Sequence, residues 1–383
     1  MPDFKLFIVA GEPSGDIHAA GLVRELIKRE APRKITLLGT GGAALAELGQ
    51  KQTATVSELA VIGFVEAIKK LPFFLRLAKR LEAQIAQERP DVVLLIDYTS
   101  FNLRFARKIK KYNIPVIQFT APQVWIWHYS RVKTLAAYFD RVLCLLPFEE
   151  DLLKKEGVNA VYIGHPAADT LIITSSDRGS FCKRFNLSED KPLIAIAPGS
   201  RLREINYLMP VIVAAAAALK AKGFEANFIL AKANSVSRQL IESYIPRELD
   251  ITVVEGDTPT VFKYADLIWI CSGTATLEAG ILGTPMIILY KAPKLDVLII
   301  KALTKLRLIA LPNIILGSEV VPEVKDNICT SKNLEEKTIE ALNKGDDYRR
   351  ALSPLKDMFA GRSPFKNGAE EVLKVIKSCG KQE

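Results

Sequence analysis

The chain of 383 residues is longer than one hydrophobic core usually organises, so its length and 49% hydrophobic content predict two folded domains and exclude disorder. The five cysteines never occur as C-x-x-C and the three histidines form no pair at ligand spacing, which argues against a disulfide framework or a zinc site. The net charge of +9 suits an anionic partner such as phospholipid or a phosphorylated substrate, and no interleaving of aromatic and basic residues indicates nucleic acid.

Membrane-spanning and exported classes are disfavoured by the apolar pattern. The longest apolar runs, such as Val211 to Leu219, are shorter than the stretch of about 20 residues that crosses a bilayer. The first ten residues lack the parts of a signal peptide and are typical of a strand. We expect a cytoplasmic protein.

The first half of the chain alternates short β-rich runs with amphipathic stretches, the pattern of βαβ units. Two of the runs are continuously apolar, as in parallel strands that helices cover on both faces. The sequence therefore predicts a doubly wound parallel sheet, with strands at Phe4 to Ala10, Ile35 to Gly39, Val92 to Ile96, Pro115 to Phe119 and Arg141 to Leu145.

The second half repeats the pattern after a polar stretch, Thr174 to Gly179, where we expect the linker. The fold class predicted is α/β, with two Rossmann-like doubly wound domains at 1–172 and 173–345. A helical segment, 346–383, is expected to pack on the first domain or on a partner subunit. Strands are predicted at Leu193 to Ala197, Ala226 to Leu230, Ile251 to Val253, Leu267 to Cys271 and Met286 to Leu289.

Ligands of open α/β sheets bind at the carboxyl ends of the strands, so the loops there are the candidate sites. The first, Gly11 to Asp16, opens a helix and presents Glu12 toward a ligand. An ordinary turn in which Ser14 or Asp16 caps the helix explains the loop equally well.

Asp97 directly follows the apolar strand Val92 to Ile96 and is placed to act as a general base. The alternative is that Asp97 caps the helix that begins near Phe101, and spacing alone favours that alternative slightly.

In the second domain, Gly199, Ser200 and Arg201 follow the first strand and precede a helix that Glu204 helps to start. A helix N-terminus with a guanidinium stabilises a departing diphosphate without a metal, which we favour over an ordinary turn with a surface arginine.

A second such loop carries Ser272, Gly273 and Thr274 after the strand Leu267 to Cys271. Glu278, about one turn into the next helix, is positioned to accept hydrogen bonds from ribose hydroxyls. The alternative is a helix-stabilising acid.

Basic and apolar residues cluster in two segments, a pattern that suits an anionic membrane surface. An equally good explanation is an amphipathic helix with solvated charges. The first segment carries Lys69, Lys70, Phe73, Phe74 and Arg76, and the second runs from Lys294 to Lys301 with Lys305 and Arg307.

Read in order, these motifs resemble the lipid-A-disaccharide synthase family over nearly the whole chain. The matching stretches include Ile96-Asp97, Gly164-His165-Pro166, the tryptophan pair Trp125 and Trp127, and Leu311-Pro312-Asn313.

The resemblance implies a GT-B fold and an inverting glycosyl transfer. 2,3-Diacylglucosamine would move from its UDP derivative to 2,3-diacylglucosamine 1-phosphate, forming the β-1,6 disaccharide 1-phosphate and UDP. It further implies no metal or other cofactor, a peripheral position on the cytoplasmic face of the inner membrane, and a homodimer as a further partner.

Carried over by position, Asp97 matches the proposed base, Glu12 an essential acid and Arg201 the arginine of the G-S-R motif. Glu278 and Asn313 match nucleotide-site residues. Ser100 and His128 depart from the family pattern, since an aspartate and an arginine are common there.

Two further hypotheses stay open from the residues. One is another UDP-N-acetylglucosamine enzyme, a 2-epimerase or the lipid II glucosaminyltransferase. The other is a non-catalytic module that binds anionic lipid through the two basic segments.

Overall fold

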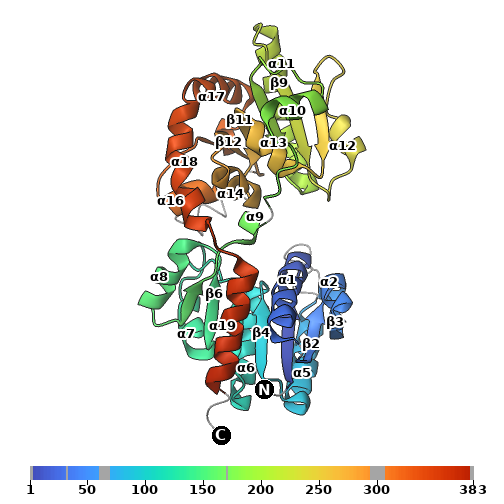
Figure 1. Cartoon of the computed structure of the whole chain (residues 1–383), viewed down its shortest axis with the longest axis vertical. Coiled ribbons are helices and arrows are strands. Elements are labelled where there is room, and N and C mark those ends of the chain that lie inside the picture. Colours follow the sequence, from blue (N-terminus) through green and yellow to red (C-terminus); the bar gives the residue numbers. More distant parts are fainter. Residues whose placement is uncertain (1–2, 32, 60–69, 170, 294–306, 380–383) are drawn as a thin grey trace. The chain divides into compact units, whose positions relative to one another are not determined.

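The structure is a computed structural model, and it describes residues 3–31, 33–59, 70–169, 171–293 and 307–379. The chain divides into two compact units, the first comprising Met1–Pro166 with Gly361–Glu383 and the second Ala167–Ala360. Each unit is an all-parallel sheet with helices on its faces, which confirms the predicted fold class (Figure 1).

The sheet of unit 1 has seven strands in the order β3-β2-β1-β4-β5-β6-β7. Its strands are β1 Phe4–Ala10, β2 Ile35–Gly41, β3 Lys51–Thr55, β4 Val92–Ile96, β5 Val116–Phe119, β6 Arg141–Cys144 and β7 Ala160–Tyr162. Its helices are α1 Pro13–Glu30, α2 Ala43–Glu47, α3 Val56–Leu59, α5 Leu71–Glu88, α6 Thr99–Ile109, α7 Arg131–Tyr138, α8 Pro147–Lys155 and α19 Pro364–Cys379.

Successive residues of each strand in unit 1 feed cores on opposite faces of the sheet, as the two-residue period of a strand requires. Phe7 and Val9 of β1 join a core with α5, α6 and α7. Leu6 and Ile8 join a second core with α1 and α19. Burial on both faces explains why these strands are apolar throughout.

The sheet of unit 2 has six strands in the order β10-β9-β8-β11-β12-β13, so its first five positions repeat the arrangement in unit 1. Its strands are β8 Leu193–Ala197, β9 Asn227–Lys232, β10 Ile251–Glu255, β11 Leu267–Cys271, β12 Met286–Tyr290 and β13 Glu323–Lys325. Its helices are α10 Arg178–Arg184, α11 Leu202–Ala221, α12 Arg238–Glu242, α13 Thr258–Tyr264, α14 Thr274–Ile281, α16 Leu311–Leu316, α17 Ser331–Asn343 and α18 Gly345–Phe359, and α9 Pro166–Asp169 begins at the boundary.

The unit boundary differs from the predicted one. It lies at residues 166 and 167, and the polar stretch expected as the linker packs within unit 2. Thr174 donates to Asp257 Oδ2 at 2.7 Å, and Asp177 caps α10 by accepting from the backbone N–H of Ser180. Its polar residues make turn and cap contacts that composition alone does not distinguish from a linker.

The C-terminal segment predicted as one piece is also divided. Helix α18 belongs to unit 2, whereas α19 packs on unit 1 (Figure 1). Asn367 donates to the carbonyl of Ile163 at 2.9 Å, and Glu370 accepts from Arg29 of α1 at 2.7 Å. Since α19 covers its own chain, the homodimer has to rest on other surfaces and stays a prediction.

Among the described residues, helix α11 alone is long and apolar enough to span a membrane. Eight of its side chains are buried, and they pack in the core of unit 2 beside Trp269. Its apolar character is therefore accounted for by that core.

Candidate functional site

Asp97 ends β4 at the carboxyl edge of the unit 1 sheet, in a backbone conformation that favours glycine. Its φ is +52°, and its N–H donates to the carbonyl of Phe119 at 3.1 Å. A non-glycine residue there stores strain of about 1–3 kcal/mol, and such strain concentrates at functional sites. Helix α6 begins at Thr99 with no side-chain cap, so the capping alternative for Asp97 does not hold.

A cavity of about 760 Å³, here called the aromatic cavity, opens beside Asp97. Apolar side chains form most of its wall: Leu71, Phe74, Leu75, Ala78, Tyr98, Phe101 and Phe105. The charged groups that line it are Glu12, Asp97, Lys79, Arg104 and Lys108. The cavity suits an amphipathic ligand with a hydrocarbon part and an anionic part.

Glu12 lies at the start of α1 and lines the same cavity, so the structure brings the two predicted carboxylates of unit 1 together. Burial, together with the Glu12 charge, raises the pKa of Tyr98 to about 12. The phenol therefore stays protonated at neutral pH and available as a hydrogen-bond donor at the cavity wall.

The first predicted membrane-facing segment is described from Lys70 onward, and Lys69 lies outside the described residues. Phe74 lines the aromatic cavity, and Phe73 packs edge-on against it with ring centroids 5.4 Å apart. Arg76 is exposed on α5. Of the second segment only Lys294 to Arg307 was predicted, and all of it but Arg307 lies outside the described residues.

Asp97 also lines a smaller cavity of about 270 Å³ with Thr120, Trp127 and Arg131. Arg131 Nη2 donates to Ser100 Oγ at 3.4 Å, so the serine that replaces the common aspartate faces a guanidinium. His128 has a φ of +51°, and no role for it follows from its position.

In unit 2, seven of the eight predicted UDP-binding residues line one cavity of about 360 Å³, here called the glycine-serine cavity. It lies at the ends of β8 and β11, which are neighbours in the sheet. The seven residues are Gly199, Ser200, Arg201, Ser272, Gly273, Thr274 and Glu278. Small residues and backbone amides give this cavity the character of a polar, anion-accepting site.

The loop after β8 is held by Glu204. Its Oε2 accepts from the backbone N–H groups of Ser200 and Arg201 at 2.9 and 3.1 Å, and its Oε1 accepts from the Arg201 guanidinium at 2.8 Å. Gly199 has a φ of +111°, and a Cβ there would lie 2.4 Å from the Glu204 carboxylate, so only glycine fits. Glu204 thus occupies the donors that we predicted for a diphosphate.

Glu278 lies in the second turn of α14, past the first turn where the helix dipole favours an acid. Burial raises the pKa of its carboxyl to about 6. A carboxylate that loses solvent without a compensating partner is costly, and perturbed acids in cavities concentrate at functional sites.

Asn313 is the exception among the predicted UDP-binding residues. Its side chain is fully buried, and all four of its hydrogen-bonding positions are used within the loop. Nδ2 donates to the Val321 carbonyl and to Glu323, and Oδ1 accepts from the N–H groups of Val320 and Val321. The structure places Asn313 as a loop anchor with no group left for a nucleotide.

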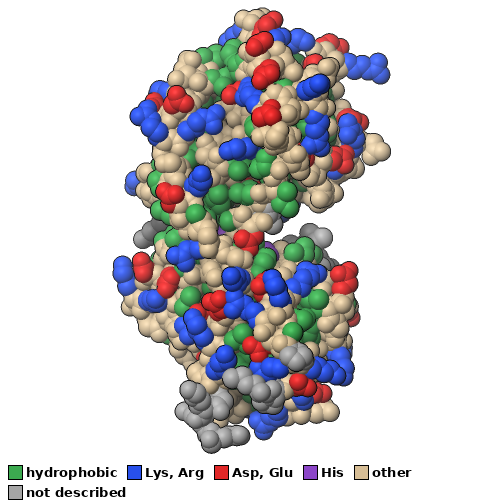
Figure 2. Space-filling model, viewed as in Figure 1, with side chains coloured by type: hydrophobic (Ala, Val, Ile, Leu, Met, Phe, Trp, Pro, Cys, Tyr) green, Lys and Arg blue, Asp and Glu red, His purple; other side chains and the backbone are tan. Residues whose placement is uncertain are grey.

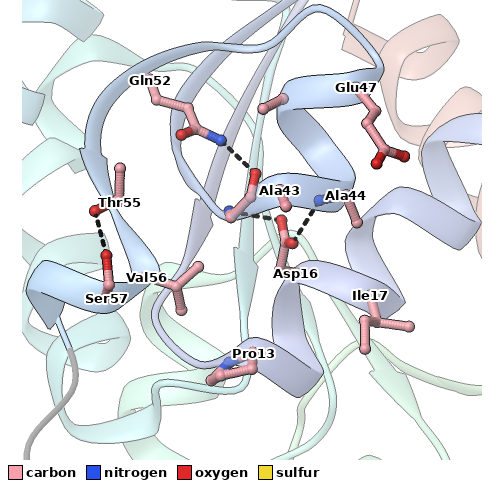
Figure 3. A pocket seen from close by; sticks show the side chains of 12 residues that line it. Pro13, Asp16, Ile17, Ala43, Ala44, Glu47, Gln52, Thr55, Val56 and Ser57 are labelled. Carbon is pink, nitrogen blue, oxygen red and sulfur yellow. Dashed lines mark hydrogen bonds between the residues drawn. The ribbon is translucent and has the colours of Figure 1, made fainter.

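Asp16 of the first loop is likewise structural, though not as the cap of its own helix. Its carboxylate accepts from the backbone N–H groups of Gly42, Ala44 and Leu45 at 2.7, 2.9 and 3.2 Å and so fixes α1 to the start of α2 (Figure 3). The adjoining cavity of about 700 Å³ is mainly apolar. Helix α1 has no side-chain cap, so Ser14 does not cap it either.

One functional candidate was missed from the sequence. His18, on α1, lies with Nδ1 3.5 Å from Asp97 Oδ2. A lone histidine within a helix gives no signal by spacing, and the contact exists only because β1 and β4 are neighbours in the sheet.

Charge and metal ligands add two observations. On the face shown in Figure 2, basic side chains are spread over both units and form no single patch. Within the described part of the chain, no group of three or more His, Cys, Asp or Glu side chains is placed to hold a metal ion. A reaction without metal stays a prediction.

Comparison with known proteins gives one consistent family. The sequence model of the lipid-A-disaccharide synthetase family matches residues 6–373. Lipid-A-disaccharide synthase of Syntrophus aciditrophicus (strain SB) is 36% identical over 378 residues, covering 97% of this chain and 98% of the relative. That of Myxococcus xanthus (strain DK1622) is 33% identical over 377 residues, covering 97% of each.

Among solved structures, the chain is similar in fold to a UDP-GlcNAc 2-epimerase from Neisseria meningitidis bound to UDP-GlcNAc. The TM-score is 0.62 at 13% identity, over 99% of this chain and 100% of the other. A glycosyltransferase from Rickettsia africae ESF-5 gives 0.59 at 14% identity over 100% of both chains. At these identities the likeness establishes the fold alone, that of GT-B glycosyltransferases and epimerases.

Proposed function

The chain belongs to the lipid-A-disaccharide synthase family, and from that premise we propose how its two cavities divide the work of the transfer. The protein is a glycosyltransferase of lipid A disaccharide synthesis. In the proposal, the aromatic cavity of unit 1 holds the lipid acceptor, and the glycine-serine cavity of unit 2 holds the UDP part of the donor.

Acceptor binding by unit 1 is supported by the lining of the aromatic cavity. Phe74, Phe101 and Phe105 offer apolar surface to an acyl chain, and burying such surface contributes about 25 cal/mol per Å². Arg104 and Lys79 line the same cavity and offer positive charge to the 1-phosphate of 2,3-diacylglucosamine 1-phosphate.

Donor binding by unit 2 is supported by the kinds of group that meet there. The Glu278 carboxylate accepts hydrogen bonds from ribose hydroxyls, and Arg201 with the N–H groups of Ser200 and Gly273 faces the diphosphate. For the diphosphate to bind those donors, the Glu204 carboxylate has to release them.

The single observation that carries the chemistry is Asp97, a strained carboxylate at the end of a central strand and in the wall of the aromatic cavity. Asp97 accepts the proton of the acceptor 6-hydroxyl while that oxygen bonds to the anomeric carbon of the donor. The bond from that carbon to the β-phosphate oxygen breaks on the opposite face, which turns an α-linked donor into a β-1,6 product. UDP leaves with the added negative charge, which Arg201 stabilises.

An anionic membrane surface is the further partner that we propose. Leu71 and Leu75, one turn apart at the start of α5, are 45% and 60% exposed, and Lys70, Arg76, Lys79 and Arg80 surround them in the sequence. Exposed leucines flanked by basic residues bind the interface of anionic bilayers. The position places the acceptor cavity, which Leu71 and Leu75 also line, at the lipid surface.

The reaction is tested by incubating the protein with UDP-2,3-diacylglucosamine and 2,3-diacylglucosamine 1-phosphate in excess EDTA. We expect UDP and the disaccharide 1-phosphate in equal amounts by mass spectrometry. Release of UDP without a disaccharide, or activity that requires added Mg²⁺, would contradict the proposal. A 2-epimerase would instead convert UDP-N-acetylglucosamine with no lipid acceptor, and a lipid-binding module would release no UDP at all.

A further inference from the structure

His18 lies against the predicted base on the side away from the cavities. Its Nδ1 is 3.5 Å from Asp97 Oδ2, and the two side chains are only 25% and 18% exposed. Asp97 lines both cavities of its edge, whereas His18 is absent from the lining of each. The imidazole therefore reaches the reaction only through Asp97.

Packing holds the imidazole in this place from two sides. The ring of Phe119, at the end of β5, is 6.1 Å from the His18 ring, and that of Phe365, at the start of α19, is 6.3 Å away. Gly15, one turn earlier in α1, lets the helix approach β4, since a Cβ there would lie 3.3 Å from Asp97 Oδ2. The ring is thus fixed before any substrate binds.

The hydrogen-bonding groups around His18 leave Asp97 as its partner. Nδ1 of His18 is buried and makes no hydrogen bond within the described structure, so the 3.5 Å approach is its nearest acidic contact there. The other titratable group that faces it is His165, after β7, whose pKa is lowered to about 4 by burial and by the charge of His18. His165 is therefore neutral at physiological pH and adds no charge to the pair.

We propose that His18 is a positioning residue for the base, an inference that rests on the proposed role of Asp97. As the site closes on substrate, Nδ1–H of a neutral His18 donates to Oδ2 of Asp97, and the short approach tightens to a hydrogen bond. That bond fixes the carboxylate rotamer, selects the Nδ1–H tautomer and leaves Oδ1 to accept the hydroxyl proton. It also favours the ionised carboxylate, because a donor to the charged form stabilises that form.

Two substitutions at His18 separate the donor from the ring. H18F keeps an aromatic ring between Phe119 and Phe365 but removes the donor, and H18N places an amide Nδ2 near the position of Nδ1. We expect H18F to lower kcat by roughly 10–100-fold, with the KM of both substrates within about twofold, and H18N to recover to within about threefold of the parent, in line with the ~10²–10⁴-fold worth of the whole base.

The pH profile supplies the readout that a purely structural role would not move. Without the donor the Asp97 carboxyl is less acidic, so the acid limb of the kcat profile moves to higher pH in H18F, by roughly half to one unit. In H18N the limb returns toward the parent position. Thermal melting and UDP binding, which belongs to the other unit, report whether H18F is folded. If H18F does not fold, H18N against H18L is the pair to compare.

Three outcomes overturn the inference. A parental kcat and acid limb in H18F would show that the contact has no role. An H18N variant as inactive as H18F would identify the imidazole itself as the base, with Asp97 as its orienting partner. Turnover retained in D97N would instead remove the proposed base and hence the proposed function, whereas an inactive D97N with a normal H18F removes only the role of His18.

Discussion

The carboxyl edges of the two sheets share one topology and differ in almost everything else that matters for ligands. In both units the strand that begins the unit lies beside the fourth, in the order 3-2-1-4-5. The edge of unit 1 has an aromatic cavity of about 760 Å³ with a strained aspartate in its wall. The edge of unit 2 has a cavity of about 360 Å³ made of glycine, serine, threonine and one buried acid.

The difference shows that the sheet fixes where a ligand binds and the loop residues decide which ligand. After β4 the chain places Tyr98 and Phe101, whose rings stack into an apolar wall. After β11 it places Ser272, Gly273 and Thr274, which leave backbone amides open. Each unit can therefore be impaired separately, and the following predictions test that separation from the largest effect to the smallest.

The substitution D97N tests the chemical role of unit 1. An amide cannot take the hydroxyl proton, so we expect kcat to fall by about 10²–10⁴-fold, measured as UDP release, with UDP affinity unchanged. D151N, at an exposed position of α8, is the matched control and is expected to keep the parental kcat. Near-normal turnover in a folded D97N protein would exclude Asp97 as the base.

The substitution F74A tests the acceptor cavity. Removing a ring that lines the cavity costs a few kcal/mol of apolar contact, so the KM for the diacylated acceptor should rise roughly 10–100-fold, while the KM for the UDP donor changes less. F73A removes the neighbouring ring that does not line the cavity and should leave both values near parental. Equal effects from the two variants would count against a defined acceptor cavity.

The substitution E278Q tests unit 2 and has two opposite effects. Loss of charge-assisted hydrogen bonds to ribose should weaken UDP binding by about 10–100-fold in calorimetry. Because the folded-state pKa of about 6 is above the ordinary 4.5, the folded protein loses stability as pH rises through this range. The glutamine removes that penalty, so the melting temperature should rise above pH 7, by up to about 2 kcal/mol of stability, and stay unchanged near pH 4. A variant that is less stable at pH 7.5 would contradict the cause given for the shift, and E242Q on α12 is the surface control.

The double substitution L71S/L75S tests the membrane contact of unit 1. Losing two exposed leucines should reduce sedimentation with vesicles rich in phosphatidylglycerol by about tenfold, as about 25 cal/mol per Å² of lost contact implies, without changing UDP affinity. I339S removes an exposed apolar residue from unit 2 and should bind vesicles normally. If both variants sediment like the parent, another surface contacts the lipid.

The substitution E204A gives the smallest expected effect. It frees the N–H groups of Ser200 and Arg201, so UDP should bind a few-fold more tightly, while the unliganded protein loses about 1 kcal/mol with the lost helix cap. Calorimetry and melting with and without UDP measure both. Weaker UDP binding would instead make Glu204 part of the nucleotide site.

The sequence predicted most of the sheet because central parallel strands carry an unbroken apolar signal. Strands β1, β4, β8 and β11 have the predicted bounds. The three strands that went unpredicted, β3, β7 and β13, all lie at sheet edges. They are short, and β3 reads Lys-Gln-Thr-Ala-Thr, so neither their length nor their hydrophobicity separates them from loops.

The site was predictable where residues follow adjacent central strands, and not where the role depends on three-dimensional partners. Ser200 and Ser272 meet because β8 and β11 pair. Asn313 was assigned to UDP by its motif, but burial and four loop hydrogen bonds decide its role. His18 and Glu204 gave no local signal, since one needs β4 beside β1 and the other needs the backbone geometry at Gly199.

The central claim, that unit 1 holds and activates the acceptor while unit 2 holds UDP, is tested most directly by titrating UDP and solubilised acceptor into D97N and E278Q by calorimetry. The account predicts that D97N binds both ligands with near-parental affinity and that E278Q loses only UDP. Loss of UDP binding in D97N with a parental fold, or loss of acceptor binding in E278Q, would contradict that division.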